Sequence, residues 1–362
     1  MCAQTCSART LLTSSAMRQS LPVIDYEEDV IVTVKDVAQR AGVSVASVSR
    51  ALNGLPGVSE SVVRRVKEAA DELHYRPNAV ARSLRTEASR ALGLVISDVT
   101  NSFFVELART IEDEAAKLGF SLILCNSDED PAKEGHYLDV LHDQRIDGLL
   151  LSPARAMTPQ IRRMREFGTP IVLLDRNLRG SGLPCAGVDG RSAIADLAEH
   201  LAEQGYRSAG VIGGPVEVSN GHQRLLDFAT EAGNRGIAVA PEHRHTGNFE
   251  VDGGRAAMSL ILDTPSPPQV VFATNNLMAL GALQVLHEQG VAVGTDMGFV
   301  SFDDVPWFSL MTPSITAIEQ PIAALGANAA SMITGLIAGQ RVRSRTVRAH
   351  LTPRQSTMRG HA

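Results

Sequence analysis

The chain has 362 residues, of which 44% are hydrophobic and 20% charged, so it can form two or three packed domains and is not intrinsically disordered. The formal net charge of −6 excludes a uniformly basic nucleic-acid-binding protein. The charge is unevenly divided, however, because residues 32–90 hold ten basic and six acidic side chains, which makes this stretch +4 and the remainder −10. A small basic unit joined to a large acidic one predicts a nucleic-acid-binding domain attached to a domain with another function.

The cysteines give no sign of a disulfide framework or a zinc site. Cys2, Cys6, Cys125 and Cys185 lie far apart with no CxxC pattern, and the ten histidines show no metal-binding spacing. We therefore expect no metal, no cofactor and a reducing, cytoplasmic location. No apolar run approaches the roughly 18 residues of a membrane span, so no membrane partner is expected. Residues 1–31 lack the continuous apolar core of a signal peptide and are predicted to be a disordered tail.

A helical pattern begins at Thr33. Thr33 followed three positions later by Asp36 resembles a capping box, and Gly42 suits the positive φ of a sharp turn. Ser44 can cap a second short helix, and a third amphipathic helix follows it. Three short helices with a tight glycine turn between the first two form the helix-turn-helix plan, which we predict for residues 32–77.

A short linker, residues 78–90, follows, with one or two possible helical turns that are too short to be stable alone. Beyond it, apolar strand-like runs alternate with amphipathic helices, a pattern typical of parallel sheets covered on both faces. We expect strands at 91–97, 121–126, 148–152, 171–175, 209–213, 270–274 and 298–302, and helices that include 103–118, 192–204, 253–262 and 277–289. Seven or more strands in residues 91–362 suit two doubly wound α/β lobes better than one sheet.

Polar side chains recur directly after these predicted strands. They are Asp98, Asn126, Asp175, Asn275 and Asp303. Ligands bind at the carboxyl edge of open α/β sheets, although each residue alone is equally explained as a helix cap or a turn. Together with Phe103, Phe104 and Phe249 in neighbouring loops, they predict a pocket for a small polar ligand.

Enzyme signatures are absent from the sequence. There is no GxSxG, HExxH or GxxxxGK[ST] motif, and no GxGxxG follows the first strand. The adjacent pair Asp303-Asp304 has no partner histidine or metal motif, so we expect no catalytic residues. A solute-binding protein of a transport system remains an alternative, since it would share the lobes but has no use for residues 33–85.

The most specific motifs are TVKDVAQRAGVSVASVSRALN at residues 33–53 and LHYRPNAVARSL at residues 73–84. With these motifs the chain resembles the lactose-repressor (LacI/GalR) family, and weaker similarities continue at 146–151, 272–281 and 299–304. The resemblance implies a sequence-specific transcriptional regulator, a repressor, that binds a palindromic DNA operator as a homodimer. It also implies a domain of two lobes similar to periplasmic binding proteins, with a small effector, by default a sugar or derivative, held between them.

Residue by residue, the resemblance implies a recognition helix that begins at Ser44. Base-edge contacts are implied for Val45, Ala46 and Arg50, because Arg can fork onto guanine while Val and Ala can touch methyl groups. Val45 is equally explained as a partly buried filler. Phosphate contacts are implied for Thr33, Ser44, Ser47, Ser49 and Asn53. In the linker, Leu84 matches the minor-groove wedge of the family, and Asn78, Arg82 and Arg85 accompany it as DNA-contacting residues.

The resemblance also implies an effector pocket. Its residues are Phe104, Arg176, Asn220, Arg224, Phe249, Asn275, Asp303 and Gln320. We expect Arg224 and Asp303 to lie on opposite walls of this cleft. Asn276 departs from the pattern, since many relatives carry Asp there.

The lobes implied by the resemblance are discontinuous, because the chain is expected to cross between them three times. One lobe comprises about 91–189 with 319–347, and the other about 190–318 with 348–362. No leucine-heptad tail of the kind that makes tetramers is present, which favours a dimer.

Overall fold

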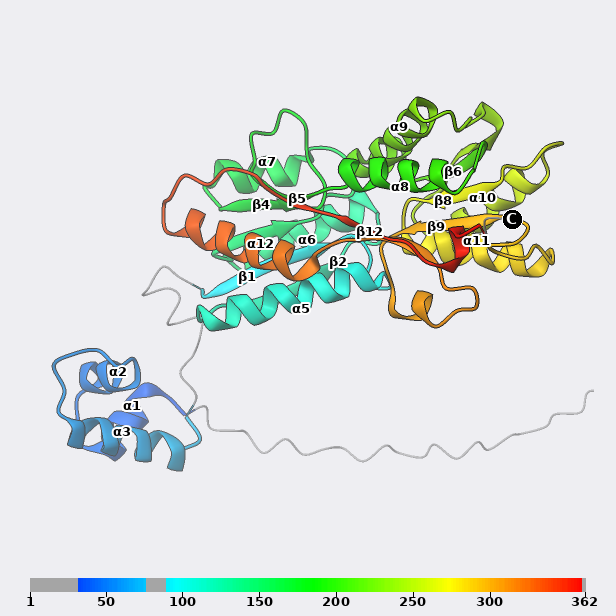
Figure 1. Cartoon of the computed structure of the whole chain (residues 1–362). Helices are drawn as coiled ribbons and strands as arrows, with labels where there is room; N and C mark the ends of the chain where they lie inside the picture. Colours follow the sequence, from blue (N-terminus) through cyan, green and yellow to red (C-terminus); the bar gives the residue numbers. More distant parts are fainter. Residues whose placement is uncertain (1–31, 76–88, 360–362) are drawn as a thin grey trace, which may run out of the picture. The chain divides into compact units, whose positions relative to one another are not determined.

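The structure is a computed structural model that describes residues 32–75 and 89–359 (Figure 1). The predicted disordered tail and most of the predicted hinge segment lie outside these residues. The chain divides into two compact units, residues 1–82 and 83–362, which we describe separately.

The small unit is a three-helix domain, as predicted. Its helices are α1 (Val34–Ala41), α2 (Val45–Leu52) and α3 (Glu60–Glu72). Val37 and Val66 are fully buried at its centre, and small alanines on all three helices let the helices pack closely.

Local signals explain where these helices begin and end. The Thr33 backbone N–H donates to the Asp36 carboxylate at 2.7 Å, which is the reciprocal bond of the predicted capping box, and the Thr33 hydroxyl donates to the same carboxylate at 2.7 Å. Gly42 ends α1 with φ of 64°, a conformation that glycine adopts without strain. Ser44 caps α2 by accepting the Ser47 N–H at 3.1 Å. These local signals therefore determine where the turn between α1 and α2 begins and ends.

The large unit contains two six-stranded sheets (Figure 1). The first has the order β11-β5-β4-β3-β1-β2 and is parallel throughout. Its strands are β1 (Ala91–Ile96), β2 (Ser121–Asn126), β3 (Gly148–Leu151), β4 (Ile171–Leu174), β5 (Cys185–Asp189) and β11 (Arg345–Arg348). The second has the order β12-β10-β9-β8-β6-β7, in which β12 pairs antiparallel with β10. Its strands are β6 (Ala209–Gly213), β7 (Arg244–Thr246), β8 (Val270–Ala273), β9 (Gly298–Phe302), β10 (Thr316–Glu319) and β12 (His350–Thr352).

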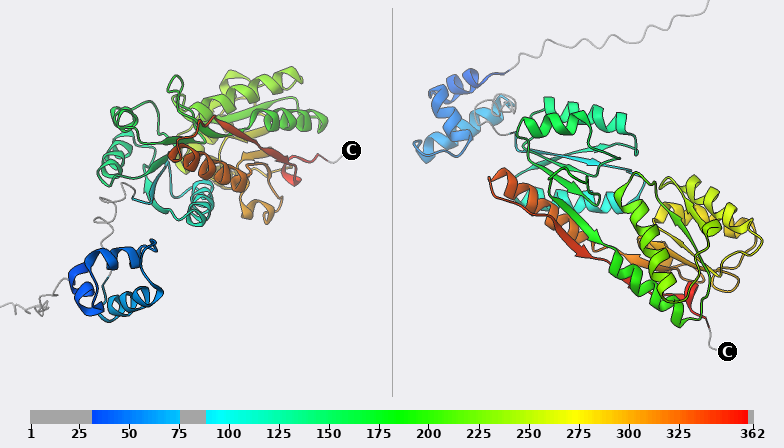
Figure 2. Two further views of the ribbon diagram at one scale, coloured as in Figure 1. Left: turned by 90° about the vertical axis from the view of Figure 1, so that its left-hand side faces the viewer. Right: turned by 90° about the horizontal axis from the view of Figure 1, so that it is seen from above.

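Helices cover both faces of each sheet, so the two lobes are doubly wound (Figure 2). On the first lobe, α5 and α12 pack together on one face, and α6 and α7 on the other. On the second lobe, α8 and α9 form one layer and α10 and α11 the other. The helices are α5 (Ser102–Lys117), α6 (Pro131–Asp143), α7 (Pro159–Glu166), α8 (Arg191–Glu203), α9 (Ser219–Asn234), α10 (Val251–Leu262), α11 (Asn276–Glu288) and α12 (Ile322–Ile337), with short 3₁₀ turns at Pro241–His243, Pro306–Ser309 and Gln355–Thr357.

The chain passes between the sheets three times, after β5, after β10 and after β11. All seven predicted strands are present, and the four helices named from the sequence begin and end within two residues of their predicted positions. Within the described residues, no helix combines the length and the apolar character that a bilayer crossing needs.

Candidate functional site

A small cavity lies between the two lobes, at the carboxyl ends of their strands. All eight effector residues implied by the family resemblance line this cavity. Its volume of about 20 Å³ has room for one water molecule, so the lobes are closed on each other. Three lining residues, Asp175, Phe249 and Asp303, have φ between 60° and 72°, and such backbone strain is typical of binding sites.

Arg176 is the basic residue that the first lobe contributes to the cavity lining. Its side chain is 4% exposed and forms a two-pronged ion pair with Glu129, at 2.7 and 2.5 Å. The guanidinium lies 5.1 Å from the centre of the Phe249 ring and 6.0 Å from that of Phe104. Burial alone would lower the pKa of Arg176, but the Glu129 carboxylate outweighs burial and raises it. The guanidinium is therefore fixed as a flat cation between two rings.

Asp175 joins the two lobes. Its Oδ2 accepts the Asn220 amide at 2.6 Å, and its Oδ1 lies 3.8 Å from the Arg224 guanidinium. Asp175 follows β4 of the first lobe, whereas both partners belong to α9 of the second. Arg176 of the same lobe lies 3.9 Å from Asp175 Oδ2, so only the contacts with Asn220 and Arg224 depend on lobe closure.

Arg224 and Asp303 are held inside the second lobe. Arg224 donates to the Thr274 carbonyl at 2.9 Å and stacks 3.6 Å above the Phe302 ring, and burial lowers its pKa against the effect of nearby carboxylates. Asp303 accepts a hydrogen bond from Gln320, and burial raises its pKa against the opposing effect of Arg224.

The prediction that Arg224 and Asp303 lie on opposite walls of the cleft is wrong. Both residues project from the same sheet edge, since α9 follows β6 and Asp303 follows β9 of one sheet. The group that faces Arg224 from the other lobe is Asp175. The lobe boundaries predicted from the resemblance already place both residues in the lobe of about 190–318, so the expectation of opposite walls disagreed with those boundaries.

A second set of hydrogen bonds also crosses the cleft. The Asn276 amide donates to Asn101 Oδ1 at 3.1 Å and contacts Ser102 Oγ at 3.2 Å, so the amino ends of α11 and α5 are joined. The Asn177 N–H donates to Ser219 Oγ at 3.1 Å. Polar side chains thus hold the lobes together around the cavity.

Several buried polar atoms at this cavity lack a hydrogen-bond partner among the described residues. They are Arg176 Nε, a donor, and Asn220 Oδ1 and Gln320 Oε1, both acceptors. Buried polar groups are normally satisfied, so unpaired donors and acceptors around one cavity favour a ligand with hydroxyl groups, which can both donate and accept.

The sequence did not assign every residue of this cavity. Glu129 was missed because it acts through Arg176 and follows no recognisable motif, and Asn101 because it caps α5. Asp98 and Asp175 had been noted as strand-end residues and do line the cavity. Asn126 does not line it, since it accepts the Val99 N–H at 3.0 Å and acts in a local turn.

The predicted DNA-reading surface lies on the small unit. Thr33, Ser44, Ala46, Arg50 and Asn53 are exposed, and Ser47 and Ser49 are partly buried. Val45 is 42% exposed at the start of α2, so its side chain is accessible on the surface of the small unit.

The two arginines of α1 and α2 differ in their pairing. Arg40 is paired with Glu72 at 2.5 Å, whereas no carboxylate of residues 32–75 or 89–359 forms an ion pair with Arg50. Arg50 thus keeps its donors available. Asn78, Arg82, Leu84 and Arg85 lie outside the described residues.

Metal binding finds no support in the part of the chain that the structure describes, where no three His, Cys, Asp or Glu side chains gather as ligands. Cys125 and Cys185 are buried free thiols, and burial raises the pKa of Cys185 to about 12.

Comparisons with known proteins match both units. Residues 33–78 match the family described as bacterial regulatory proteins, lacI family, and residues 198–357 match a periplasmic binding protein-like domain. The ribose operon repressor of Halalkalibacterium halodurans is 35% identical over 82% of this chain and 87% of its own length. The chain belongs to the LacI family. It is accordingly a DNA-binding transcriptional repressor regulated by a small effector, and the transport alternative is not favoured.

Solved structures support the same architecture for this LacI-family repressor. A lac repressor dimer bound to operator and an anti-inducer is 26% identical, covers 91% of this chain and 99% of its own, and has a TM-score of 0.79. A complex of the transcriptional regulator CelR with cellobiose is 27% identical, covers 90% and 99%, and has a TM-score of 0.69.

Proposed function

We propose that this LacI-family repressor binds a palindromic operator as a homodimer and that a monosaccharide or a derivative, bound between the lobes by the residues that line the cavity, sets its DNA affinity. The observation that carries the proposal is that all eight candidate effector residues line one cavity between the lobes. This cavity has room for one water molecule, so the lobes must open to admit a sugar. Aromatic faces stack on sugar rings, while a fixed guanidinium, carboxylates and amides orient hydroxyl groups. Cellobiose in the CelR structure is consistent with this class of ligand.

On the DNA side, Arg50 reads a guanine in each half-site, and Val45 and Ala46 contact base methyl groups. Phosphate contacts come from Thr33, Ser44, Ser47, Ser49 and Asn53, and the linker residues Asn78, Arg82, Leu84 and Arg85 act at the minor groove. The exposure of α2 and the unpaired state of Arg50 within the described residues support this assignment. The operator-bound lac repressor dimer is a structural relative with the same domain order.

The dimer proposal rests on the edge of the first sheet. β2 is an edge strand, and Ile123 and Leu124 on it are 37% and 48% exposed, beside Leu118 at 50%. Exposed apolar edge strands invite pairing or burial by another chain. A second copy of this chain would cover them.

We further propose that residues 32–77 form the helix-turn-helix domain, residues 78–90 the linker and residues 91–362 the effector-binding domain. Its two lobes comprise about 91–189 with 319–347, and about 190–318 with 348–362. The membership of the two sheets supports it, since β11 joins the first and β12 the second. Binding rather than catalysis is favoured, because the relatives that match most of the chain are transcriptional repressors. A cytoplasmic location follows from an operator on cytoplasmic DNA.

The test is a panel of monosaccharides screened by thermal shift, with calorimetry for those that stabilise the protein. A binding sugar should then change the affinity of the full chain for its operator fragment in a gel shift. If no sugar binds while the protein still binds its operator, the effector class is wrong but the repressor assignment stands.

A further inference from the structure

An unusual concentration of arginine lies in the first lobe, away from the effector cavity. Residues 152–182 contain six arginines and only two carboxylates, within a chain whose net charge is negative. Two of the six are already used, because Arg176 is buried against Glu129 and Arg163 pairs with Asp139 at 3.0 Å. The other four are exposed, and no carboxylate in the described part of the chain forms an ion pair with any of them: Arg155, Arg162, Arg165 and Arg179.

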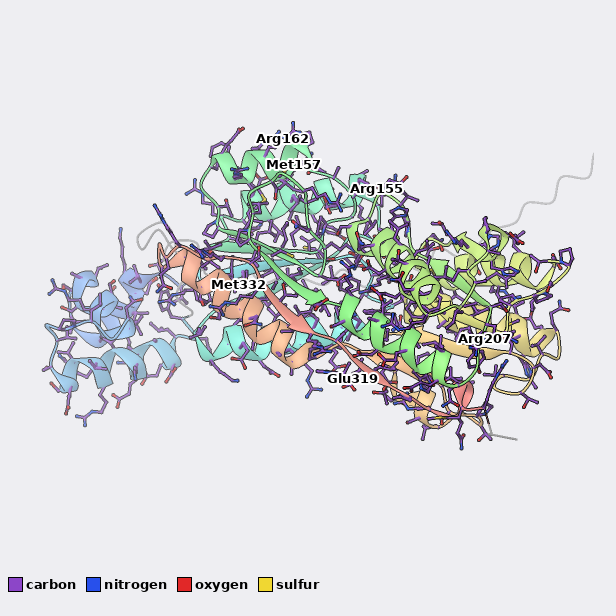
Figure 3. The ribbon with its side chains drawn as sticks, turned by 45° about the horizontal axis from the view of Figure 1, so that its top comes forward. Arg155, Met157, Arg162, Arg207, Glu319 and Met332 are labelled. Atoms are coloured by element: carbon purple, nitrogen blue, oxygen red, sulfur yellow. The ribbon has the colours of Figure 1, made fainter. Side chains whose placement is uncertain are left out.

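Three of these arginines surround one hollow. Arg162 and Arg165 reach it from α7, and Arg179 from the loop after β4, with Met157 and Gly180 completing the wall. Figure 3 labels Arg162 and Met157 beside α7 at one margin of the lobe. The hollow has a volume of about 640 Å³, which lies within the range of small-molecule sites. We name it the arginine hollow.

The geometry of the arginine hollow is partly fixed. Arg165 donates to the Ser181 carbonyl at 2.6 Å, so one guanidinium is anchored to the loop that carries Arg179. A second depression of about 350 Å³ shares Met157 and Arg179 and adds Arg155. Four guanidinium groups therefore line two adjoining depressions.

Charge and donor geometry select the ligand. Three arginines and one carboxylate, Glu166, give the arginine hollow a local charge of +2. A phosphate monoester carries about −1.5 to −2 at neutral pH, and guanidinium forks match phosphate oxygens with two hydrogen bonds each. We propose that the arginine hollow is a second ligand site, distinct from the effector cavity, that binds a small organic phosphate.

The loop 175–182 connects the two sites. Asp175 and Arg176 at its start line the effector cavity, and Arg179 and Gly180 line the arginine hollow. The same loop donates from the Asn177 N–H to Ser219 of the second lobe. Phosphate bound at Arg179 therefore acts on the segment that holds the lobes closed.

The experiment titrates the full chain with inorganic phosphate and with ribose 5-phosphate, with ribose as the uncharged match, by calorimetry at constant ionic strength. Arg162→Ala and Arg179→Ala are tested as separate variants. Each should weaken the binding of both phosphates about tenfold, since each removes a charge-assisted contact. The matched control is Arg163→Ala. This variant removes an exposed arginine of α7 that pairs with Asp139 outside the hollow, so the variant protein should bind phosphate as the parent protein does.

Four results would overturn the proposal. Inorganic phosphate and ribose 5-phosphate could both fail to bind, or Arg163→Ala could weaken them as much as Arg162→Ala. Ribose 5-phosphate could also bind with an affinity that neither hollow variant changes, which would assign it to the effector cavity. A random DNA duplex serves as counter-probe: if the two hollow variants weaken only DNA binding, the surface binds nucleic acid rather than a small phosphate. Failure of the sugar assignment would leave this test intact, because inorganic phosphate requires no sugar site.

Discussion

Asn220 donates to Asp175 across the cleft at 2.6 Å, so a residue at the start of α9 in one lobe is bonded to the end of β4 in the other. Arg224, one helical turn further along α9, lies 3.8 Å from the same carboxylate. The Asp175 carboxylate of the first lobe thus contacts two groups of the second lobe, the neutral Asn220 amide and the positively charged Arg224 guanidinium. Because these partners exist only when the lobes meet, a ligand that bonds to any of the three changes the stability of the closed state.

Removing charge from the second lobe should abolish the response to effector while leaving DNA binding intact. Asp303→Asn replaces a buried carboxylate by a weaker acceptor, and Arg224→Ala removes a stacked guanidinium, so each should lower sugar affinity by about 1.5–3 kcal/mol. Calorimetry with the effector, and operator gel shifts with and without it, measure the two functions separately.

The control for that pair is Arg235→Ala, since Arg235 at the end of α9 pairs with Glu231 outside the cavity. It should bind effector as the parent protein does. Wild-type effector affinity in both Asp303→Asn and Arg224→Ala would show that the cavity is not the effector site.

The amino ends of α5 and α11 should act as a latch. Asn276→Ala removes the hydrogen bonds to Asn101 and Ser102, so the closed state should lose about 0.5–1.5 kcal/mol for each bond. Effector binding should weaken, and the amides at the start of both helices should exchange faster with deuterium in the ligand-free protein. Asn328→Ala, on α12 within one lobe, should leave exchange at these helix starts unchanged. Equal exchange in the two variants would argue that the latch adds nothing to closure.

Long apolar strands and strong helix caps were predictable from the sequence because their signals are local. The β1 run Ala91–Ile96 and the Ser44 cap of α2 depend on a few adjacent residues. Five strands were not predicted. Strands β7, β11 and β12 are three or four residues long and largely polar, as edge strands often are. Strands β5 and β10 are also short, with five and four residues, although they lie inside their sheets. Their place in a sheet is decided by pairing with distant strands.

The effector residues could be assigned through motifs, but their partners could not. Asp303 stands at a strand end, where a ligand group is expected. Glu129, by contrast, contributes to the site only because the fold brings its carboxylate within hydrogen-bond distance of Arg176, which lies 47 positions further along the chain. Likewise, only the packed lobes reveal that Arg224 faces Asp175 rather than Asp303.

Base reading by the small unit should depend on Arg50. Arg50→Ala should cost about 1–3 kcal/mol per half-site for the cognate operator and little for random DNA, since a guanine-reading fork carries sequence discrimination. Fluorescence anisotropy with both duplexes at one salt concentration measures the difference. Arg40→Ala is the control, because that guanidinium is paired with Glu72. If Arg50→Ala weakened cognate and random DNA equally, Arg50 would be a phosphate contact only.

A buried carboxyl group should make the stability of the large unit depend on pH. Glu134 on α6 is fully buried, its Oε2 accepts the Ala154 N–H at 2.7 Å, and burial raises its pKa from 4.5 to about 7. The folded state therefore binds this proton more tightly than the unfolded state does. The resulting stabilisation is complete below about pH 4.5 and is lost as pH rises through about 7, with a total of about 3 kcal/mol.

Glu134→Gln tests this argument, because the amide keeps an oxygen to accept the Ala154 N–H but cannot ionise. At pH 8 the variant should be more stable than the parent protein in urea unfolding, and the difference should shrink steadily toward pH 5. Asp139→Asn, a change on the same helix that removes the ion pair with Arg163 and keeps an oxygen to accept from Gln160, should leave the pH profile unchanged. If Glu134→Gln instead lowered stability by the same amount at every pH, the carboxyl group would be ionised throughout and held by its neighbours. Arg176 would then stabilise Glu134 more strongly than burial destabilises it.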